Sequence, residues 1–161
     1  VGDVALSASY NPEPGVDNLE AETGFAVVYS GFDNMELSAG YFDDGDTAEN
    51  NTFGIKYTMG QMTAAYQMTE VNYAGTATKD QSATHMGISI AVNDALSVSA
   101  GAQNIEFGDN SAEDEKNSGF GASYTMGSIS MYGGFNKLEN TGGSATAGDV
   151  EASIFNISFA F

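Results

Sequence analysis

The dominant feature of this chain is a two-residue alternation of apolar and polar side chains. Successive side chains of an extended strand point to opposite faces, so this period predicts β-strands rather than helices. Ten alternating segments can be counted, at residues 3–10, 24–31, 34–42, 50–59, 61–73, 82–93, 95–108, 117–126, 128–138 and 148–161. We therefore predict an all-β chain.

The connections between these segments alternate between short and long. The short ones contain the glycine and asparagine chemistry of tight hairpins, at Gly31-Phe32-Asp33-Asn34, Gly60, Asn93-Asp94 and Gly127. The longer ones span residues 11–23, 43–49, 74–81, 109–116 and 139–147. Because tight turns join antiparallel neighbours, this alternation predicts short turns at one end and long loops at the other. The pattern is typical of an up-and-down transmembrane β-barrel.

One face of each predicted strand carries the large side chains. In the fourth segment Phe53, Ile55 and Tyr57 alternate with Gly54 and Lys56. Aromatic residues recur four positions apart on this face, as Phe25 and Tyr29, Phe53 and Tyr57, Phe120 and Tyr124, and Phe155 and Phe159.

So many large residues would overfill a small barrel, whereas pointing outward they form two aromatic girdles around an aliphatic belt. We therefore expect the apolar face to contact lipid and the small polar face to line water. A soluble β-protein, in which the apolar face packs into a core, is the alternative.

The charge balance narrows the classes of partner. Lys and Arg number 4 against 22 Asp and Glu, a formal net charge of −18, and no residue is arginine. A nucleic-acid partner is excluded because it requires cations facing phosphates.

The absence of cysteine excludes disulfides and thiolate metal sites. No run reaches the roughly 18 apolar residues of a spanning helix, but a barrel strand needs only about 9–11 alternating residues.

Ionisable residues on the predicted strands are the candidate pore-lining groups. We assign five of them to the polar side by alternation: Glu36, Lys56, Glu70, His85 and Glu106. Carboxylates outnumber cations among them, so they would bias a pore toward cations. The single histidine, without a nucleophile motif, predicts no enzymatic activity.

Three acidic clusters in the loops are candidate calcium sites. Two of them consist of Asp109 with Glu113, Asp114 and Glu115, and of Asp17, Glu20 and Glu22. The third lies in the loop at residues 43–49. It contains Asp43, Asp44, Asp46 and Glu49, and several carboxylate oxygens are what Ca²⁺ prefers. The spacing does not match an EF-hand, and a solvated acidic loop is the simpler interpretation. No other cofactor is expected.

The final segments carry a resemblance to a known family. The strand Phe120-Gly121-Ala122-Ser123-Tyr124 and the alternating terminus with Ile157, Phe159 and Phe161 resemble the closing strands of Gram-negative general porins, most closely the Rhodobacter type. The resemblance implies an outer-membrane diffusion channel for small hydrophilic solutes, built as a sixteen-stranded barrel and assembled as a homotrimer. It also implies that the terminal Ile157, Phe159 and Phe161 are read by the barrel-assembly machinery.

Ten segments are fewer than the sixteen that the resemblance implies. We therefore expect residues 1–161 to form a single β-barrel domain that is the C-terminal part of a larger porin; the chain begins without Met or a signal peptide. A complete, narrow ten-stranded barrel is a second possibility. A secreted acidic β-protein, such as a calcium-stabilised adhesin or surface-layer module, is the alternative function.

Overall fold

The computed structural model describes residues 3–12, 20–45 and 47–160, and these form one β-sheet of ten strands. The strands are β1 (Val4–Asn11), β2 (Glu22–Phe32), β3 (Met35–Asp43), β4 (Ala48–Met59), β5 (Met62–Tyr73), β6 (Gln81–Ala91), β7 (Leu96–Phe107), β8 (Glu115–Met126), β9 (Ile129–Glu139) and β10 (Val150–Phe159). Each predicted segment contains one strand, so the all-β prediction is confirmed. Two short 3-10 helices in the long loops, η1 (Ala77–Lys79) and η2 (Thr141–Gly143), were not predicted.

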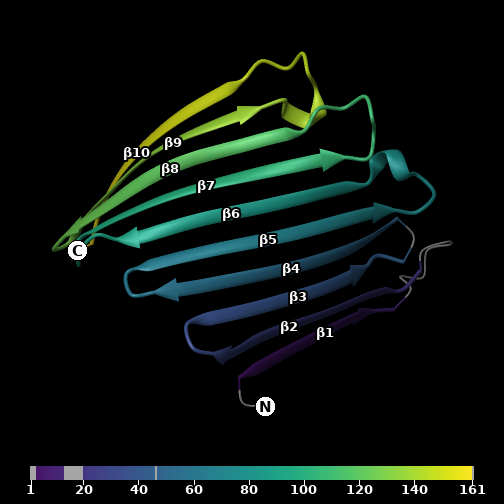
Figure 1. Cartoon of the computed structure of the whole chain (residues 1–161), viewed down its shortest axis with the longest axis horizontal. Helices are drawn as coiled ribbons and strands as arrows, with labels where there is room; N and C mark the ends of the chain where they lie inside the picture. The colour runs from purple at the N-terminus through teal and green to yellow at the C-terminus, as the bar shows by residue number, and fades with distance from the viewer. Residues whose placement is uncertain (1–2, 13–19, 46, 161) are drawn as a thin grey trace.

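The strands follow one another across the sheet in chain order, each antiparallel to the next. Figure 1 shows the connections β2–β3, β4–β5, β6–β7 and β8–β9 at one end of the sheet and the connections β5–β6, β7–β8 and β9–β10 at the opposite end. Asn34, Gly60 and Gly127 adopt φ values of 63°, 58° and 60° in three of the short turns. Glycine and asparagine tolerate this left-handed conformation best. The meander prediction is therefore confirmed.

The sheet is open. In the part of the chain that the structure describes, β1 pairs only with β2 and β10 only with β9, so neither edge closes onto the other. The complete ten-stranded barrel, which would need a ladder between β1 and β10, is not formed. Within the described residues, β1 and β10 each have a strand neighbour on one side only and are the edge strands of the sheet.

The described part of the chain has a single layer and no hydrophobic core. Ala48, at 9% exposure, is its only buried hydrophobic residue, whereas Phe120 is 64% and Phe155 is 70% exposed. A soluble domain of this length would remove most of its chain surface from water. The alternative with the aromatic rings packed in a core is therefore wrong for this structure. No helix in the described ranges is long and apolar enough to span a membrane.

One irregularity changes the facing of a residue. The β2–β3 register shifts between Tyr29 and Phe32, which places Phe32 opposite Met35. A bulge inserts an unpaired residue and so changes which face the next side chain takes. The rings of Tyr29 and Phe32 then meet edge to face, with centroids 5.1 Å apart.

Candidate functional site: the two faces of the sheet

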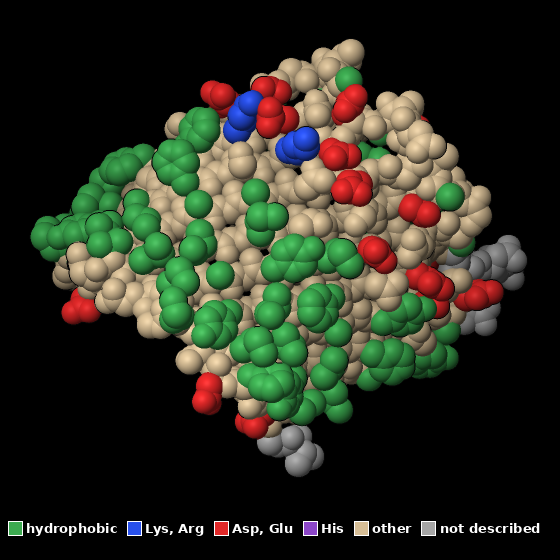
Figure 2. Space-filling view, in the orientation of Figure 1, with side chains coloured by type: hydrophobic (Ala, Val, Ile, Leu, Met, Phe, Trp, Pro, Cys, Tyr) green, Lys and Arg blue, Asp and Glu red, His purple; other side chains and the backbone are tan. Residues whose placement is uncertain are grey.

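The apolar side chains form one continuous face across all ten strands. Leu37 lies opposite Tyr29 on one side and Ile55 on the other, and Ile55 lies opposite Tyr66. The eight predicted girdle residues all lie on this face: Phe25, Tyr29, Phe53, Tyr57, Phe120, Tyr124, Phe155 and Phe159. Figure 2 shows hydrophobic side chains in broad contiguous areas, with acidic side chains concentrated toward the long-loop end. Within the described residues the large apolar side chains are exposed on this face instead of being buried in a core.

Four of the girdle residues mark the boundary of the apolar belt on the long-loop side: Phe25, Phe53, Phe120 and Phe155. Each is preceded, two residues earlier on the same face, by a polar residue: Thr23, Asn51, Ser118 and Ser153. Tyr29, Tyr57, Tyr124 and Phe159 lie four residues further toward the short turns. The register thus agrees with two aromatic levels flanking an aliphatic zone, as in membrane-spanning strands. Contact with lipid itself stays a prediction.

Two of the predicted pore-lining residues lie on the apolar face. Glu70 and Glu106 are both paired with Ser82, and they share a face with Met68 and Ala102. Their assignment to the polar face was wrong, because the observed register places Glu70 on the face of Met68 and Glu106 on the face of Ala102. Both lie on the long-loop side of the phenylalanines that bound the apolar belt, where the side chains of this face are polar.

The other three ionisable residues lie on the polar face as predicted. Glu36 and Lys56 are directly opposite each other in β3 and β4, and Lys56 Nζ donates to Glu36 Oε1 at 2.8 Å. His85 lies between Gln67 and Gln103 of the neighbouring strands. The ion pair neutralises the only described cation on the middle of this face.

Cross-strand hydroxyl pairs bind much of the polar face together. The pairs are Thr52 with Thr69 at 3.0 Å, Thr58 with Thr63 at 3.2 Å, Ser97 with Ser123 at 2.7 Å and Thr125 with Ser130 at 3.2 Å. Each joins residues directly opposite each other, where side chains interact most strongly. The hydroxyl groups of these four pairs are therefore satisfied within the wall.

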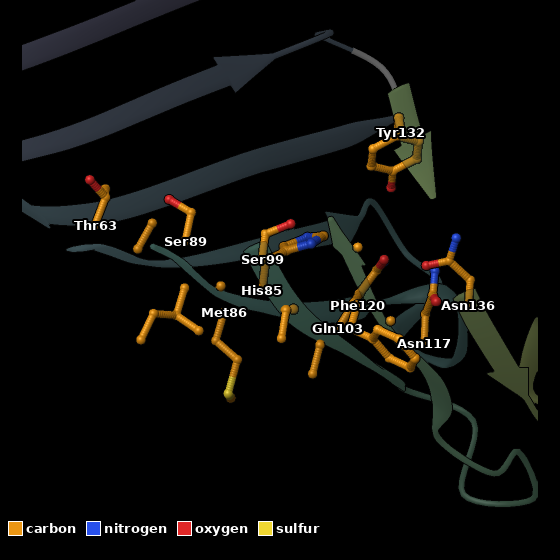
Figure 3. A pocket seen from close by; sticks show the side chains of 18 residues that line it. Thr63, His85, Met86, Ser89, Ser99, Gln103, Asn117, Phe120, Tyr132 and Asn136 are labelled. Carbon is orange, nitrogen blue, oxygen red and sulfur yellow. The ribbon is translucent and has the colours of Figure 1, made fainter. Parts of the chain in front are cut away.

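The polar face is hollowed over β6 to β9. The hollow has a volume of about 500 Å³, and its lining includes His85, Gln103, Asn117, Tyr132 and Asn136. In Figure 3 these side chains lie on one side of the strands, whereas Met86 and Phe120 point to the other side. Apart from His85 and Tyr132, this lining contains no titratable side chain. Sequence reasoning missed this hollow because it depends on which residues of separate strands lie side by side.

The acidic loop between β3 and β4 uses its carboxylates to hold the backbone. Asp44 Oδ1 accepts from the N–H groups of Thr47 and Ala48, both at 2.7 Å, and Asp43 Oδ1 accepts from Gly45 N–H at 2.8 Å. Asp46 lies outside the described residues. Within those residues no group of three or more metal-ligating side chains gathers. Calcium binding by Asp43, Asp44, Asp46 and Glu49 therefore stays a prediction.

A second long loop uses an acid in the same way. The N–H and Oγ of Ser111 donate to Asp109, and these hydrogen bonds hold the pKa of that carboxyl below its usual range.

The predicted assembly-signal residues Ile157 and Phe159 lie on the apolar face of the edge strand β10. Phe161 lies outside the described residues.

Solved porin structures share this architecture. An anion-selective porin from Comamonas acidovorans superposes with a TM-score of 0.74 at 16% identity, over 100% of this chain and 57% of that one. A porin refined at 1.8 Å resolution gives a TM-score of 0.73 at 18% identity, over 100% of this chain and 59% of that one. A mutant of the Rh. blastica porin gives 0.67 at 21% identity, over 100% of this chain and 52% of that one. These likenesses establish the fold, and the chain spans somewhat more than half the length of each of the three.

The sequence comparisons give a separate result. A search of curated proteins found no relative that matches. A family model described as Gram-negative porin matches residues 1–143, which is most of the chain. With the ten-stranded meander and its two contrasting faces, this match shows that the chain belongs to the Gram-negative porin family.

Proposed function

We propose that this chain forms part of an outer-membrane channel through which small hydrophilic solutes and ions diffuse passively. The observation that carries the proposal is the two-faced sheet: a continuous exposed apolar face backs a polar face of serine, threonine and glycine. Lipid covers the first face and water the second, as in a porin wall. A channel of this kind needs no catalytic group, because width and wall charge select the solutes.

The barrel is closed by strands outside this chain. The outer sides of β1 and β10 pair with those strands, so that neither strand remains at the edge of a sheet. The greater length of the matched porin chains supports this arrangement, and a sixteen-stranded barrel is the size that the resemblance implies. Ile157, Phe159 and Phe161 act as the terminal signal for the barrel-assembly machinery, and the finished barrels associate as homotrimers.

The channel prefers cations. The formal net charge of −18 supports this preference, since acidic residues crowd the long loops and produce a negative potential at that entrance. Glu36 contributes little to it while Lys56 is paired with it. The fold alone does not decide the sign of selectivity, because one of the similar porins is anion-selective.

Conductance in planar bilayers tests the channel. The intact protein, with all of its strands, is expected to give stepwise current increases in potassium chloride. Under a salt gradient the reversal potential should have the sign of cation selectivity. Silence from correctly folded, inserted protein would overturn the channel, whereas an anion-selective reversal potential would overturn only the cation preference.

A further inference from the structure

The hollow on the polar face has a floor of three glycines. Gly87 of β6 is paired with Gly101 of β7, and Gly101 is paired with Gly119 of β8. No register shift accompanies them, so they do not mark a bulge. Glycine inside a regular strand weakens it, and it commonly marks a bulge, a tight bend of a barrel strand, or a place where a ligand or another backbone approaches closely. Among the described residues, no side chain covers Gly87 or Gly101, which leave a trough across β6 and β7, whereas the Asn136 side-chain amide lies over Gly119 and closes that end of the row.

The side chains above this floor are hydrogen-bonding groups, and none of them is Asp, Glu, Lys or Arg. His85, Gln103 and Asn117 form the row on one side of the glycines, since each is opposite the next. Asn136 lies opposite Gly119 at the end of the floor. Within the described residues, the side chains of these four residues make no hydrogen bond to another protein group. Their donors and acceptors are therefore available to a solute.

An aromatic ring lies at the end of the trough. Gly121 and Gly134 are paired, and a Cβ on either would lie within 2.8 Å of the Tyr132 hydroxyl oxygen. The ring thus lies across two glycines, with Tyr132 41% exposed. Figure 3 shows Tyr132 on the same side of the strands as Gln103, Asn117 and Asn136. A ring lying along a wall, beside amides, gives a solute both an apolar surface and hydrogen bonds.

We propose that this trough binds a neutral polyhydroxylated solute, such as a linear oligosaccharide, on its way through the channel. Side-chain amides carry donors and acceptors together, as sugar hydroxyls do, and Tyr132 accepts the C–H face of a sugar ring. No Asp, Glu, Lys or Arg lines the trough, although the whole chain carries −18. The volume of about 500 Å³ is typical of a small-molecule site. The proposal rests on the proposed diffusion function, to which it adds a solute class.

The matched variants are Gly87→Ile and Gly40→Ile. A Cβ on Gly87 would meet nothing closer than the Ala100 carbonyl oxygen at 3.7 Å, and a Cβ on Gly40 nothing closer than the Phe25 carbonyl oxygen at 3.7 Å. Both lie on the polar face, but only Gly87 belongs to the trough. A β-branched side chain suits both strands. The first variant fills the trough, and the second adds equal bulk elsewhere on the wall.

The experiment measures binding of maltotriose to the intact protein in two ways. The first is the concentration-dependent reduction of single-channel current, and the second is calorimetry on the folded protein in detergent. We expect saturable binding that Gly87→Ile weakens about tenfold, as expected for the loss of one or two hydrogen bonds, while Gly40→Ile changes it less than about twofold. Trigalacturonate, which has similar size and three carboxylates, should bind more weakly than maltotriose.

The outcomes separate the site from the channel. Open channels without saturable maltotriose binding, or equal effects of the two glycine variants, would overturn the trough and leave the channel intact. Stronger binding of trigalacturonate would overturn the neutral solute class. Calorimetric binding lost only in Gly87→Ile, with no conductance in any variant, would uphold the site and overturn the diffusion function.

Discussion

Ile55 and Lys56 are neighbours in β4, yet they belong to two different environments. Ile55 lies among Leu37 and Tyr66 on the apolar face, whereas Lys56 forms an ion pair with Glu36 on the polar one. The two faces use the same backbone hydrogen bonds and differ only in side chains. In the proposed channel, stability in the membrane and transport would therefore depend on separate sets of residues that lie one position apart along each strand.

The largest effect is expected from a charge in the middle of the apolar belt. Ile55→Arg should lower the free energy of unfolding from a bilayer by about 2–4 kcal/mol, because the guanidinium would lie near the bilayer midplane. Denaturant-induced unfolding in lipid vesicles measures it. Thr58→Arg on the polar face is the control, and should cost only the Thr58–Thr63 hydrogen bond, about 0.5–1.5 kcal/mol. Equal losses in the two variants would contradict the assigned facing.

A smaller effect is expected from the hydroxyl pairs of the polar face. Ser97→Ala removes the 2.7 Å hydrogen bond to Ser123 and should reduce unfolding stability by about 0.5–1.5 kcal/mol. The same unfolding assay applies, with single-channel conductance expected to remain close to wild type. A loss as large as that of Ile55→Arg would mean that this face is dry rather than water-lined.

The cost of a charge to unfolding stability should depend on its depth in the membrane as much as on the face that carries it. Asn51 lies on the same face as Ile55 but on the long-loop side of Phe53. Asn51→Arg should therefore cost no more than about 1 kcal/mol, as found for arginine near a membrane interface. If it costs as much as Ile55→Arg, the apolar belt extends past the phenylalanines and the two-girdle arrangement is wrong.

The smallest effect on stability is expected at the ion pair. Both members are substantially exposed, so Lys56→Gln should change unfolding stability by less than about 1 kcal/mol. It leaves the Glu36 carboxylate unpaired, which should move the reversal potential toward stronger cation selectivity. Lys79→Gln, in the η1 loop, removes the same charge away from the β3–β4 wall. An equal shift in both variants would assign the effect to total charge rather than to Glu36.

The strands and their facing could be predicted because alternation has only one geometric meaning in an extended chain. Glu70 and Glu106 were assigned to the wrong face, although counting by twos from Met68 or Ala102 along the strand places each on the apolar face. The Phe32 bulge and the glycine trough could not be predicted, since both depend on the pairing register between strands. The open edges also lay beyond the pattern, because alternation within strands does not indicate whether the first strand pairs with the last.

Cysteine accessibility tests the central claim most directly, because the natural chain contains no cysteine. Ile55→Cys and Ala65→Cys place one thiol on each face, at residues whose strands β4 and β5 are paired. In vesicles containing the intact protein, a membrane-impermeant maleimide should label Ala65→Cys and leave Ile55→Cys unmodified. A fluorophore attached in detergent should then be quenched by acyl-chain bromolipids only at position 55. The reverse pattern, or equal labelling and equal quenching at both positions, would contradict an apolar face in lipid and a polar face in water.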